Sequence, residues 1–414
     1  MARWMLGLLG LGLLSFSSSQ ATAQTWTRFH GPNGTGALET EKIPTQLTPD
    51  NILWKTPLPG IGHAAPVIWG NHLFTQSAIP EDGTQVIICL DATTGKMLWE
   101  KRYKSGTYHI HDRNSFASST PTVDARHVYA SWATPEMLTV TAITHDGQQA
   151  WQMPLGPFDA EHGFGTSPIV HGDLVIQADQ QRSANENERP LTSSIVALDA
   201  ATGDIRWRTP RKSAVVSYSA PCVYQPAGSA AQLICCSTAH GFFGLELATG
   251  KPLWEFDVFT MRTVSSPLLV GDRVLGSTGS GAGGNYLISV RLGANPEVEY
   301  KIDQQAPYVP TSVARGDLLF LWSDKGIVSS VAADNSQVHW RERVGGNYSG
   351  SPVRAGSAIY CISETGELVV LAADTKYQVL SKLPLGEPSR STPALTDDRL
   401  YIRTDSTMYC IGQK

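Results

Sequence analysis

From Ile52 onward, short apolar runs alternate with turn residues, and two patterns recur in turn along the chain. In the first pattern, a Ser, Thr or Ala followed by Pro precedes an apolar run, a turn and a second apolar run. Proline is tolerated at the first residue of a strand, where a missing N–H costs least, so each copy predicts a hairpin. The copies are Ala65-Pro66, Thr120-Pro121, Ser167-Pro168, Ala220-Pro221, Ser266-Pro267, Ser351-Pro352, Thr392-Pro393 and the weaker Pro310-Thr311-Ser312.

The second pattern is an apolar run, a turn with Thr-Gly, and a run that ends in Trp. Its clearest copy begins at Ala197 and reaches Trp207, and residues 90–99 and 244–254 match it. Looser copies end at Trp151, Tyr300, Trp340 and Leu380. We expect the repeated Trp to pack between neighbouring sheets, because large aromatic side chains dominate such burial. The residues predicted to do so are Trp54, Trp99, Trp151, Trp207, Trp254 and Trp340.

One copy of each pattern makes a four-stranded antiparallel sheet. The repeat length ranges from 41 residues (Pro352 to Pro393) to 55 residues (Pro66 to Pro121), which is typical of β-propeller blades. Residues 51–55 form an outer strand without inner strands, whereas residues 392–412 supply three strands without an outer one. Pairing the two segments removes the open edges. The sequence therefore predicts an all-β, eight-bladed propeller over residues 51–414, whose last blade is closed by strands from both ends of the chain.

The first 50 residues divide into two parts. Arg3 precedes the apolar stretch from Trp4 to Leu14, which is too short to span a bilayer, and Ala21-Thr22-Ala23 is typical of a signal-peptide cleavage site. We expect residues 1–23 to be a signal peptide and residues 24–50 an N-terminal extension. No cysteine follows the apolar stretch for a lipid anchor, so a periplasmic or extracellular location is expected.

The charge of the chain argues against two classes of partner. The formal net charge is −5 and no basic run exceeds two residues, which argues against a nucleic-acid or anionic-membrane partner. No stretch is long and apolar enough for a transmembrane segment.

Cys222 and Cys235 flank a predicted turn symmetrically. A disulfide across this hairpin is one interpretation, and two buried thiols in neighbouring strands are the other.

The motif Ala-x-Asp-x-x-Thr-Gly-x-x-x-Trp at residues 197–207 resembles the blade-docking repeat of pyrroloquinoline-quinone (PQQ) dehydrogenases and of the outer-membrane assembly lipoprotein BamB. The predicted mature chain more closely resembles secreted PQQ-like propeller proteins of the kind common in planctomycetes. Residues 26–36, 114–121 and 409–412 are similar to segments of that group. The resemblance implies a quinoprotein-type propeller.

A binding site is expected at the mouth of the central channel. In a propeller, the loops that enter the inner strands share one face with the loops between the second and third strands. Here these loops are polar and several are long, and convergent polar groups in a concavity are a default binding-site hypothesis. The alternative is that they only cover the propeller. The predicted ligand-binding residues, from different repeats at similar phase, are Asn114, His162, Asp179, Arg262 and Tyr308.

Other chemistry is less well supported. His109, His111 and His162 could hold zinc, although loop histidines commonly serve as hydrogen-bonding groups. Cys235-Cys236 is similar to the vicinal disulfide of quinoprotein alcohol dehydrogenases, but adjacent strand residues point to opposite faces. The Gly-rich residues 279–284 lack the strand–loop–helix context of a phosphate loop and are interpreted as a top loop. No metal site and no catalytic set are predicted.

We therefore expect a binding or scaffold propeller that engages a protein partner or a small polar ligand, without catalysis and without a cofactor. One alternative is a PQQ-dependent oxidoreductase with bound calcium, which requires Glu161, Asn114 and Asp179 to converge. The other alternative is an assembly scaffold similar to BamB. His and Arg suit an anion, whereas the predicted set lacks the roughly six to eight oxygen ligands that calcium prefers. A polar organic ligand or a peptide thus ranks above a metal–quinone complex.

Overall fold

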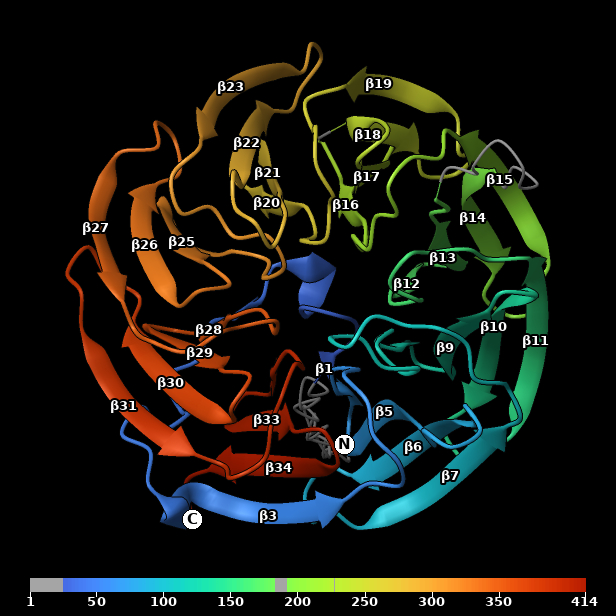
Figure 1. Ribbon diagram of the computed structural model, residues 1–414, viewed down its shortest axis with the longest axis horizontal. Coiled ribbons are helices and arrows are strands. Elements are labelled where there is room, and N and C mark those ends of the chain that lie inside the picture. Colours follow the sequence, from blue (N-terminus) through green and yellow to red (C-terminus); the bar gives the residue numbers. More distant parts are fainter. Residues whose placement is uncertain (1–24, 183–191, 227) are drawn as a thin grey trace, which may run out of the picture.

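The computed structural model describes residues 25–182, 192–226 and 228–414. The predicted signal peptide lies outside these residues. The described chain forms eight sheets arranged around a central axis, each with four consecutive or closing strands (Figure 1). Two sheets gain a fifth strand from the N-terminal extension. The all-β, eight-bladed propeller predicted from the repeats is confirmed.

Each blade runs from its inner strand to its outer strand in chain order. Blade 1 contains β4 (Val67–Trp69), β5 (His72–Ala78), β6 (Gln85–Asp91) and β7 (Met97–Tyr103), and blade 2 contains β8 (Thr122–Val123), β9 (His127–Thr134), β10 (Met137–Thr144) and β11 (Gln149–Gly156). Blade 3 contains β12 (Ile169–His171), β13 (Leu174–Asp179), β14 (Ser193–Asp199) and β15 (Ile205–Arg211), and blade 4 contains β16 (Cys222–Tyr224), β17 (Gln232–Ser237), β18 (Gly241–Glu246) and β19 (Pro252–Phe256). Blade 5 contains β20 (Leu268–Val270), β21 (Arg273–Thr278), β22 (Tyr286–Arg291) and β23 (Glu297–Ile302), and blade 6 contains β24 (Val313–Arg315), β25 (Leu318–Trp322), β26 (Ile327–Ala332) and β27 (Val338–Arg343). Blade 7 contains β28 (Val353–Ala355), β29 (Ala358–Ile362), β30 (Glu367–Ala372) and β31 (Val379–Pro384).

The eighth blade joins the two ends of the propeller. It combines β32 (Ala394–Leu395), β33 (Arg399–Arg403) and β34 (Thr407–Gly412) with β3 (Ile52–Pro57), which pairs antiparallel with β34. Lys55 lies opposite Tyr409 and Thr56 lies opposite Met408 in this register. The predicted closure is therefore confirmed, and Figure 1 shows blue β3 beside red β34.

The residue before each inner-strand proline ties one blade to the next. The N–H of Thr120 in blade 2 donates to Ser167 Oγ of blade 3 at 2.9 Å. The bond repeats around the channel except where the acceptor position is Ala220 or Ala65, neither of which carries a hydroxyl. We call these N–H to hydroxyl bonds between successive blades the hydroxyl ring. Its other bonds run from Ala65 to Thr120, Ala220 to Ser266, Ser266 to Thr311, Thr311 to Ser351, and Ser351 to Thr392.

The outer-strand tryptophans dock onto the following blade. Trp207 in blade 3 donates its indole N–H to the carbonyl of Leu247 in blade 4 at 3.1 Å. The equivalent donors and acceptors are Trp54 to Ala92, Trp99 to His145, Trp151 to Ala200 and Trp340 to Asp374. Trp254 instead donates to Gln232 of its own blade. Five of the six tryptophans thus bond to the next blade, whereas Trp254 bonds within its own blade.

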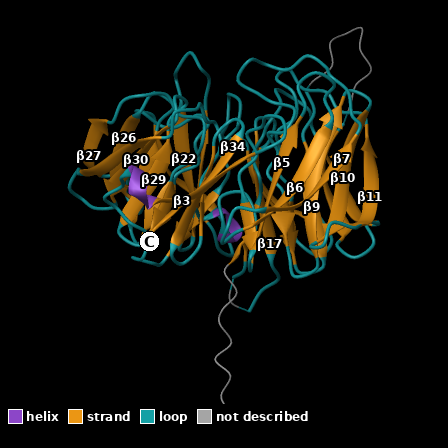
Figure 2. Cartoon of the chain, turned by 90° about the horizontal axis from the view of Figure 1, so that it is seen from below, coloured by secondary structure: helices purple, strands orange, loops and turns teal. Residues whose placement is uncertain are grey.

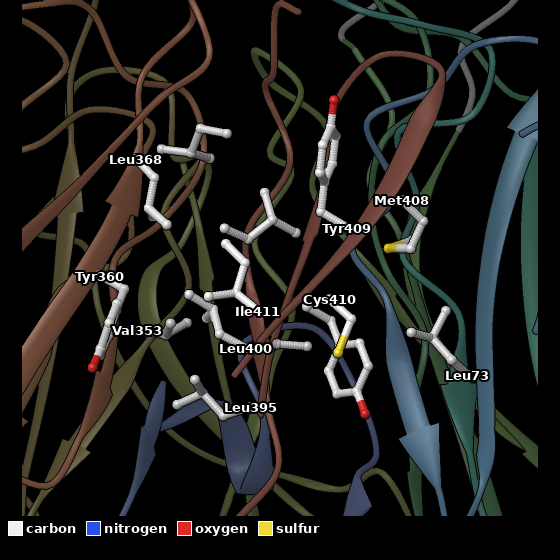
Figure 3. Packing of buried hydrophobic residues seen from close by; sticks show 14 of the residues in the cluster. Leu73, Val353, Tyr360, Leu368, Leu395, Leu400, Met408, Tyr409, Cys410 and Ile411 are labelled. Carbon is white, nitrogen blue, oxygen red and sulfur yellow. The ribbon is translucent and has the colours of Figure 1, made fainter. Parts of the chain in front are cut away.

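Apolar side chains from neighbouring blades fill the spaces between the sheets. The cluster around the closing blade includes Leu73 of blade 1, Tyr360 of blade 7 and Ile411 of blade 8, all with an exposed fraction of 0%. In Figure 3, Ile411 lies between Tyr360 on one side and Leu73 on the other. The packing of both ends of the chain into one core explains how the ring stays closed.

The N-terminal extension fills the lower end of the channel, opposite the long loops. Its strands β1 (Thr25–Trp26) and β2 (Ala37–Leu38) add to β4 of blade 1 and β28 of blade 7. Between them, Arg28 donates to the carbonyl of Pro221 in blade 4 at 2.6 Å. Trp26 and His30 have an exposed fraction of 0%. The extension also carries the two 3-10 helices, η1 (Pro32–Gly34) and η2 (Pro49–Asn51). In Figure 1 it crosses the centre of the ring in blue, and Figure 2 shows the long loops gathered on one side of the disc.

Of the two interpretations of Cys222 and Cys235, the disulfide is wrong, and the two residues are buried thiols in neighbouring strands. Cys222 lies opposite Ile234, so the hairpin is centred on Gly228 rather than between Gly228 and Ser229. This shift by half a residue places the Cys222 side chain on the sheet face of Cys236 and opposite to that of Cys235. All six described cysteines are buried free thiols, and adjacent Cys235 and Cys236 face different blade junctions.

Candidate functional site

A cavity of about 790 Å³ lies at the mouth of the channel. Its wall includes residues from the loops that enter the inner strands of all eight blades, and Phe29 of the extension also contributes. Four residues predicted to share a binding site line this cavity together, namely Asn114, His162, Arg262 and Tyr308. Repeat phase therefore brings together side chains from four different blade-entry loops. The Gly-rich loop at 279–284 joins β21 to β22, and its Ser280 and Gly281 line the cavity as well.

Asp179 does not belong to this cavity, contrary to the sequence-based expectation. It is the last residue of β13, has an exposed fraction of 4%, and accepts hydrogen bonds from Ser194 Oγ and Gln181 Nε2. Burial raises the pKa of its carboxyl group to about 6, despite Arg208 at 3.9 Å. The sequence places Asp179 at the start of a polar loop, but the strand includes it, so its side chain is held inside blade 3.

The cavity wall is cationic. Arg113, Arg262, Lys325 and Arg390 line it, and none of the described lining residues is Asp or Glu. His63, His111 and His162 contribute three imidazoles. Two carboxylates, Glu161 and Glu364, pair with some of these cations from outside the lining set. The surface offered to a ligand consists of hydrogen-bond donors and positive charge, which favours an anion.

One side of the wall joins blades 3 and 5. Arg262 donates to His162 Nε2 at 2.5 Å and lies 3.5 Å from a carboxylate oxygen of Glu161. Burial and the neighbouring Arg262 guanidinium lower the pKa of His162. The rings of His111 and His162 have centroids 4.6 Å apart. A neutral His162 therefore accepts from Arg262 and holds its guanidinium at the cavity.

His111 and His162 are not joined at the cavity by His109, the third histidine considered as a zinc ligand. His109 is absent from the residues that line the cavity. Within the described ranges, no group of three or more His, Cys, Asp or Glu side chains is placed to hold a metal ion. The interpretation of loop histidines as hydrogen-bonding groups fits the Arg262–His162 contact.

The opposite side of the wall comes from blades 7, 8 and 1. Glu364 accepts from Ser349 Oγ at 2.6 Å and lies 3.9 Å from both Arg390 and Arg113. Burial, together with the charges of Arg390 and Arg403, lowers the pKa of His63 to about 3. His63 is therefore neutral at physiological pH, and Arg390 supplies the positive charge on this side.

Three buried donors at the wall have no hydrogen-bond partner in the part of the chain that the structure describes. They are the hydroxyl of Tyr218 and the Nε–H groups of Arg262 and Arg390. Buried donors are nearly always satisfied in folded proteins. A ligand that brings acceptor oxygens into the cavity would satisfy them.

Sequence reasoning missed several lining residues, although their phase in the repeat marks them. Each blade contributes one residue to the hydroxyl ring: the residue before the inner-strand proline or, in blade 6, Thr311. In every blade, the residue two positions before this ring residue lines the cavity. This set consists of His63, Ser118, Gly165, Tyr218, Val264, Val309, Ser349 and Arg390. Alternate residues of an extended segment share one face, so counting back two from the ring residue would have found them.

The chain matches the profile of a known protein family. The profile described as outer membrane protein assembly factor BamB matches residues 45–189, 139–294 and 324–413. The chain belongs to this family. The first two segments overlap, and the three together cover most of the propeller, as expected for a repeated unit. A comparison with curated proteins finds no match.

Solved structures share the fold at low sequence identity. BamB from Moraxella catarrhalis is 15% identical with a TM-score of 0.61, over 88% of this chain and 97% of that one. Quinohemoprotein alcohol dehydrogenase from Comamonas testosteroni is 12% identical with a TM-score of 0.64, over 94% and 81%. The corresponding enzyme ADHIIG from Pseudomonas putida HK5 is also 12% identical, with a TM-score of 0.67 over 94% and 80%. These similarities establish the propeller architecture and leave the function to the site. Among the described residues, no helix is long and apolar enough to cross a membrane.

Proposed function

We propose that this BamB-family propeller is a binding protein whose channel-mouth cavity takes an anionic ligand. One observation carries the proposal: four cationic side chains line the cavity, and none of the described lining residues is Asp or Glu. The unpaired donors of Tyr218, Arg262 and Arg390 add to it, because each needs an acceptor. Tyr218, Tyr308 and Phe29 supply apolar and aromatic surface around the charges.

The residues around the cavity do not fit a calcium-bound quinone. Calcium takes oxygen ligands, chiefly carboxylates and carbonyls. Of the three residues required to converge, Asn114 lines the cavity, Glu161 pairs with Arg262 and Asp179 is buried inside blade 3. Cys235 and Cys236 lie on opposite faces of β17 and are free thiols. The donor set thus supports anion binding over PQQ-dependent oxidation.

The family and the fold also favour a role outside the cytoplasm. We expect the protein to act in the periplasm or outside the cell, as the N-terminal sequence predicts. A protein partner that presents an anionic group is compatible with this location and with the cavity. Neither a nucleic acid nor an anionic membrane is expected to bind, because the formal net charge of the chain is −5.

Calorimetric titration with citrate tests the proposal. We expect citrate to bind, and both Arg262→Gln and Arg390→Gln to weaken it by about tenfold or more, since each removes a charge-assisted donor. Arg102→Gln is the matched control, because Arg102 lies on β7 at the outer surface of blade 1 and pairs with Glu100. Undetectable citrate binding, or equal loss in the control, would contradict the proposal.

A parallel titration with PQQ separates the enzymatic alternative. If the cavity takes PQQ only as a carboxylate anion, PQQ binds without calcium and its quinone stays unchanged. Calcium-dependent PQQ binding, followed by reduction of the quinone on addition of an alcohol, would instead support a dehydrogenase.

A further inference from the structure

A second concavity continues outward from the cavity. It has a volume of about 610 Å³ and lies between blades 5 and 6. Five residues line both spaces, so the two share one rim; they are Arg113, Ser280, Gly281, Tyr308 and Lys325. We call the second space the blade 5/6 groove. Blades 5 and 6 are neighbours in Figure 1, and β27 is the outer strand of blade 6.

We propose that the cavity and the blade 5/6 groove together bind the C-terminal segment of an acidic polypeptide, with its terminal carboxylate in the cavity and the chain leaving through the groove. This inference rests on the proposed function and names the class of ligand.

The closed lower end of the channel prevents a chain from passing through it. The extension fills that end with Trp26, Arg28 and His30, which are buried, and its Phe29 lines the cavity. A polymer therefore cannot thread through the propeller. It can place only a terminus or a side chain in the cavity and must leave on the side by which it entered.

The charge of the cavity selects which end enters. Arg113, Arg262, Lys325 and Arg390 favour a carboxylate and repel an α-ammonium group. Arg262 and Arg390 also have unpaired Nε–H donors. A C-terminal carboxylate offers two acceptor oxygens and can satisfy such donors.

The groove carries groups that suit a polypeptide. Asn285, Gln304 and Gln305 line it with amides, and the loop containing Gly281 and Gly283 leaves room for a backbone. Its charged lining residues are three acids and four cations, namely Asp303, Asp324, Glu342, Arg113, Lys325, Arg341 and Arg343. This mixed charge favours a peptide, which bears amides and both charges, over a uniformly anionic polysaccharide.

The spacing on β27 favours acidic residues at alternate positions. Arg341 and Arg343 are two positions apart on β27, so their side chains leave the same face of the strand about 6.6 Å apart. Neither has a salt bridge within the described residues: Arg341 donates to Gln304 Oε1 and Arg343 to the carbonyl of Lys325. An extended peptide repeats its side chains at the same interval, so alternate carboxylates can meet both guanidinium groups.

Fluorescence anisotropy with a synthetic peptide tests the inference. The probe is an eight-residue peptide with glutamate at every second position, a free C-terminal carboxylate and fluorescein at its N-terminus. We expect C-terminal amidation to weaken binding by about tenfold or more, and replacement of the glutamates by glutamine to weaken it by about fivefold. The double variant Arg341→Gln/Arg343→Gln should lose this preference for glutamate, whereas Arg102→Gln should keep it. Melting curves of each variant verify folding.

Equal affinity for the free and amidated peptides would overturn the inference, as would an unchanged glutamate preference in the double variant. Citrate binding without peptide binding would overturn it and leave the proposed function standing. Loss of both would refute both. Binding of an oligogalacturonate in place of the peptide, with the same dependence on Arg341 and Arg343, would assign the groove to an acidic glycan and so reject the polypeptide.

Discussion

The indole of Trp207 in blade 3 lies directly against Gly250 of blade 4. A methyl group built at Gly250 would lie 2.4 Å from the indole ring, and the backbone there has a φ of +72°. The Thr-Gly turn of one blade is thus the docking surface for the tryptophan of the previous blade. The motif at residues 197–207 is linked in this way to both neighbours, because its Gly203 meets Trp151 of blade 2 and its Trp207 meets Gly250 of blade 4.

Truncation of this tryptophan should weaken the junction. We expect Trp207→Ala to lower the free energy of unfolding by about 3–5 kcal/mol, as large aromatic truncations in cores do. Trp254→Ala is the comparison, since Trp254 is less buried and bonds within its own blade. Its effect should be smaller. Denaturant unfolding measures both, and an equal or smaller loss for Trp207→Ala would show that docking on Gly250 is not the important contact.

The hydroxyl ring offers a stabilising substitution. Ala220 occupies a position where most blades place Ser or Thr, so no side-chain oxygen there can accept from the N–H of Ser167. We expect Ala220→Ser to add this bond and to raise the free energy of unfolding by about 0.5–1.5 kcal/mol. Conversely, Ser266→Ala should lower it, because the N–H of Ala220 donates to Ser266 Oγ at 3.0 Å. Melting temperatures measured in parallel decide the matter: a destabilised Ala220→Ser protein would be inconsistent with the ring.

His63 should make stability depend on pH in the acid range. Its pKa is lowered to about 3 by burial and by Arg390 and Arg403, whereas an unfolded histidine has a pKa of about 6.5. The unfolded state therefore binds more protons between these values, and the native state loses stability as the pH falls through this window. We expect a slope of up to about 1.4 kcal/mol per pH unit from this group. His63→Gln should reduce the slope between pH 6 and 4, and an identical slope in the variant would contradict the assignment.

The extension can be tested without removing it. Gly36 has a φ of +65°, and a methyl group there would lie 2.3 Å from the His30 ring and 2.7 Å from Val313. Gly36→Ala should therefore displace the segment that fills the channel and speed its cleavage by a protease. Gly70→Ala is the matched control, since its φ is +58° and no atom lies within 4 Å of the added methyl group. Equal cleavage of residues 25–50 in both variants would mean that the close contact at Gly36 does not hold the extension.

Much of the fold was predictable from local patterns. Thr202-Gly203 marks the turn of a hairpin, and Trp207 marks the outer strand that follows this turn. The proline after Ser167 marks an inner strand. Because such signals act over a few residues, they predict the strand order, the blade count and the closure by residues 51–55. Repeat phase also brought Asn114, His162, Arg262 and Tyr308 to one cavity, since equivalent positions of radial blades face the same axis.

Tertiary structure decided what depends on register and on long-range packing. Cys222 and Cys235 were separated by a shift of half a residue in a hairpin, which moves a side chain to the other face of a sheet. Asp179 was withdrawn from the cavity because β13 continues through it and its carboxylate finds Ser194 and Gln181. The extension crosses the channel through contacts as distant in sequence as Arg28 with Pro221. Sequence alone thus determined the repeating blade, whereas the closed cavity and its charge arise only when eight blades and the extension meet.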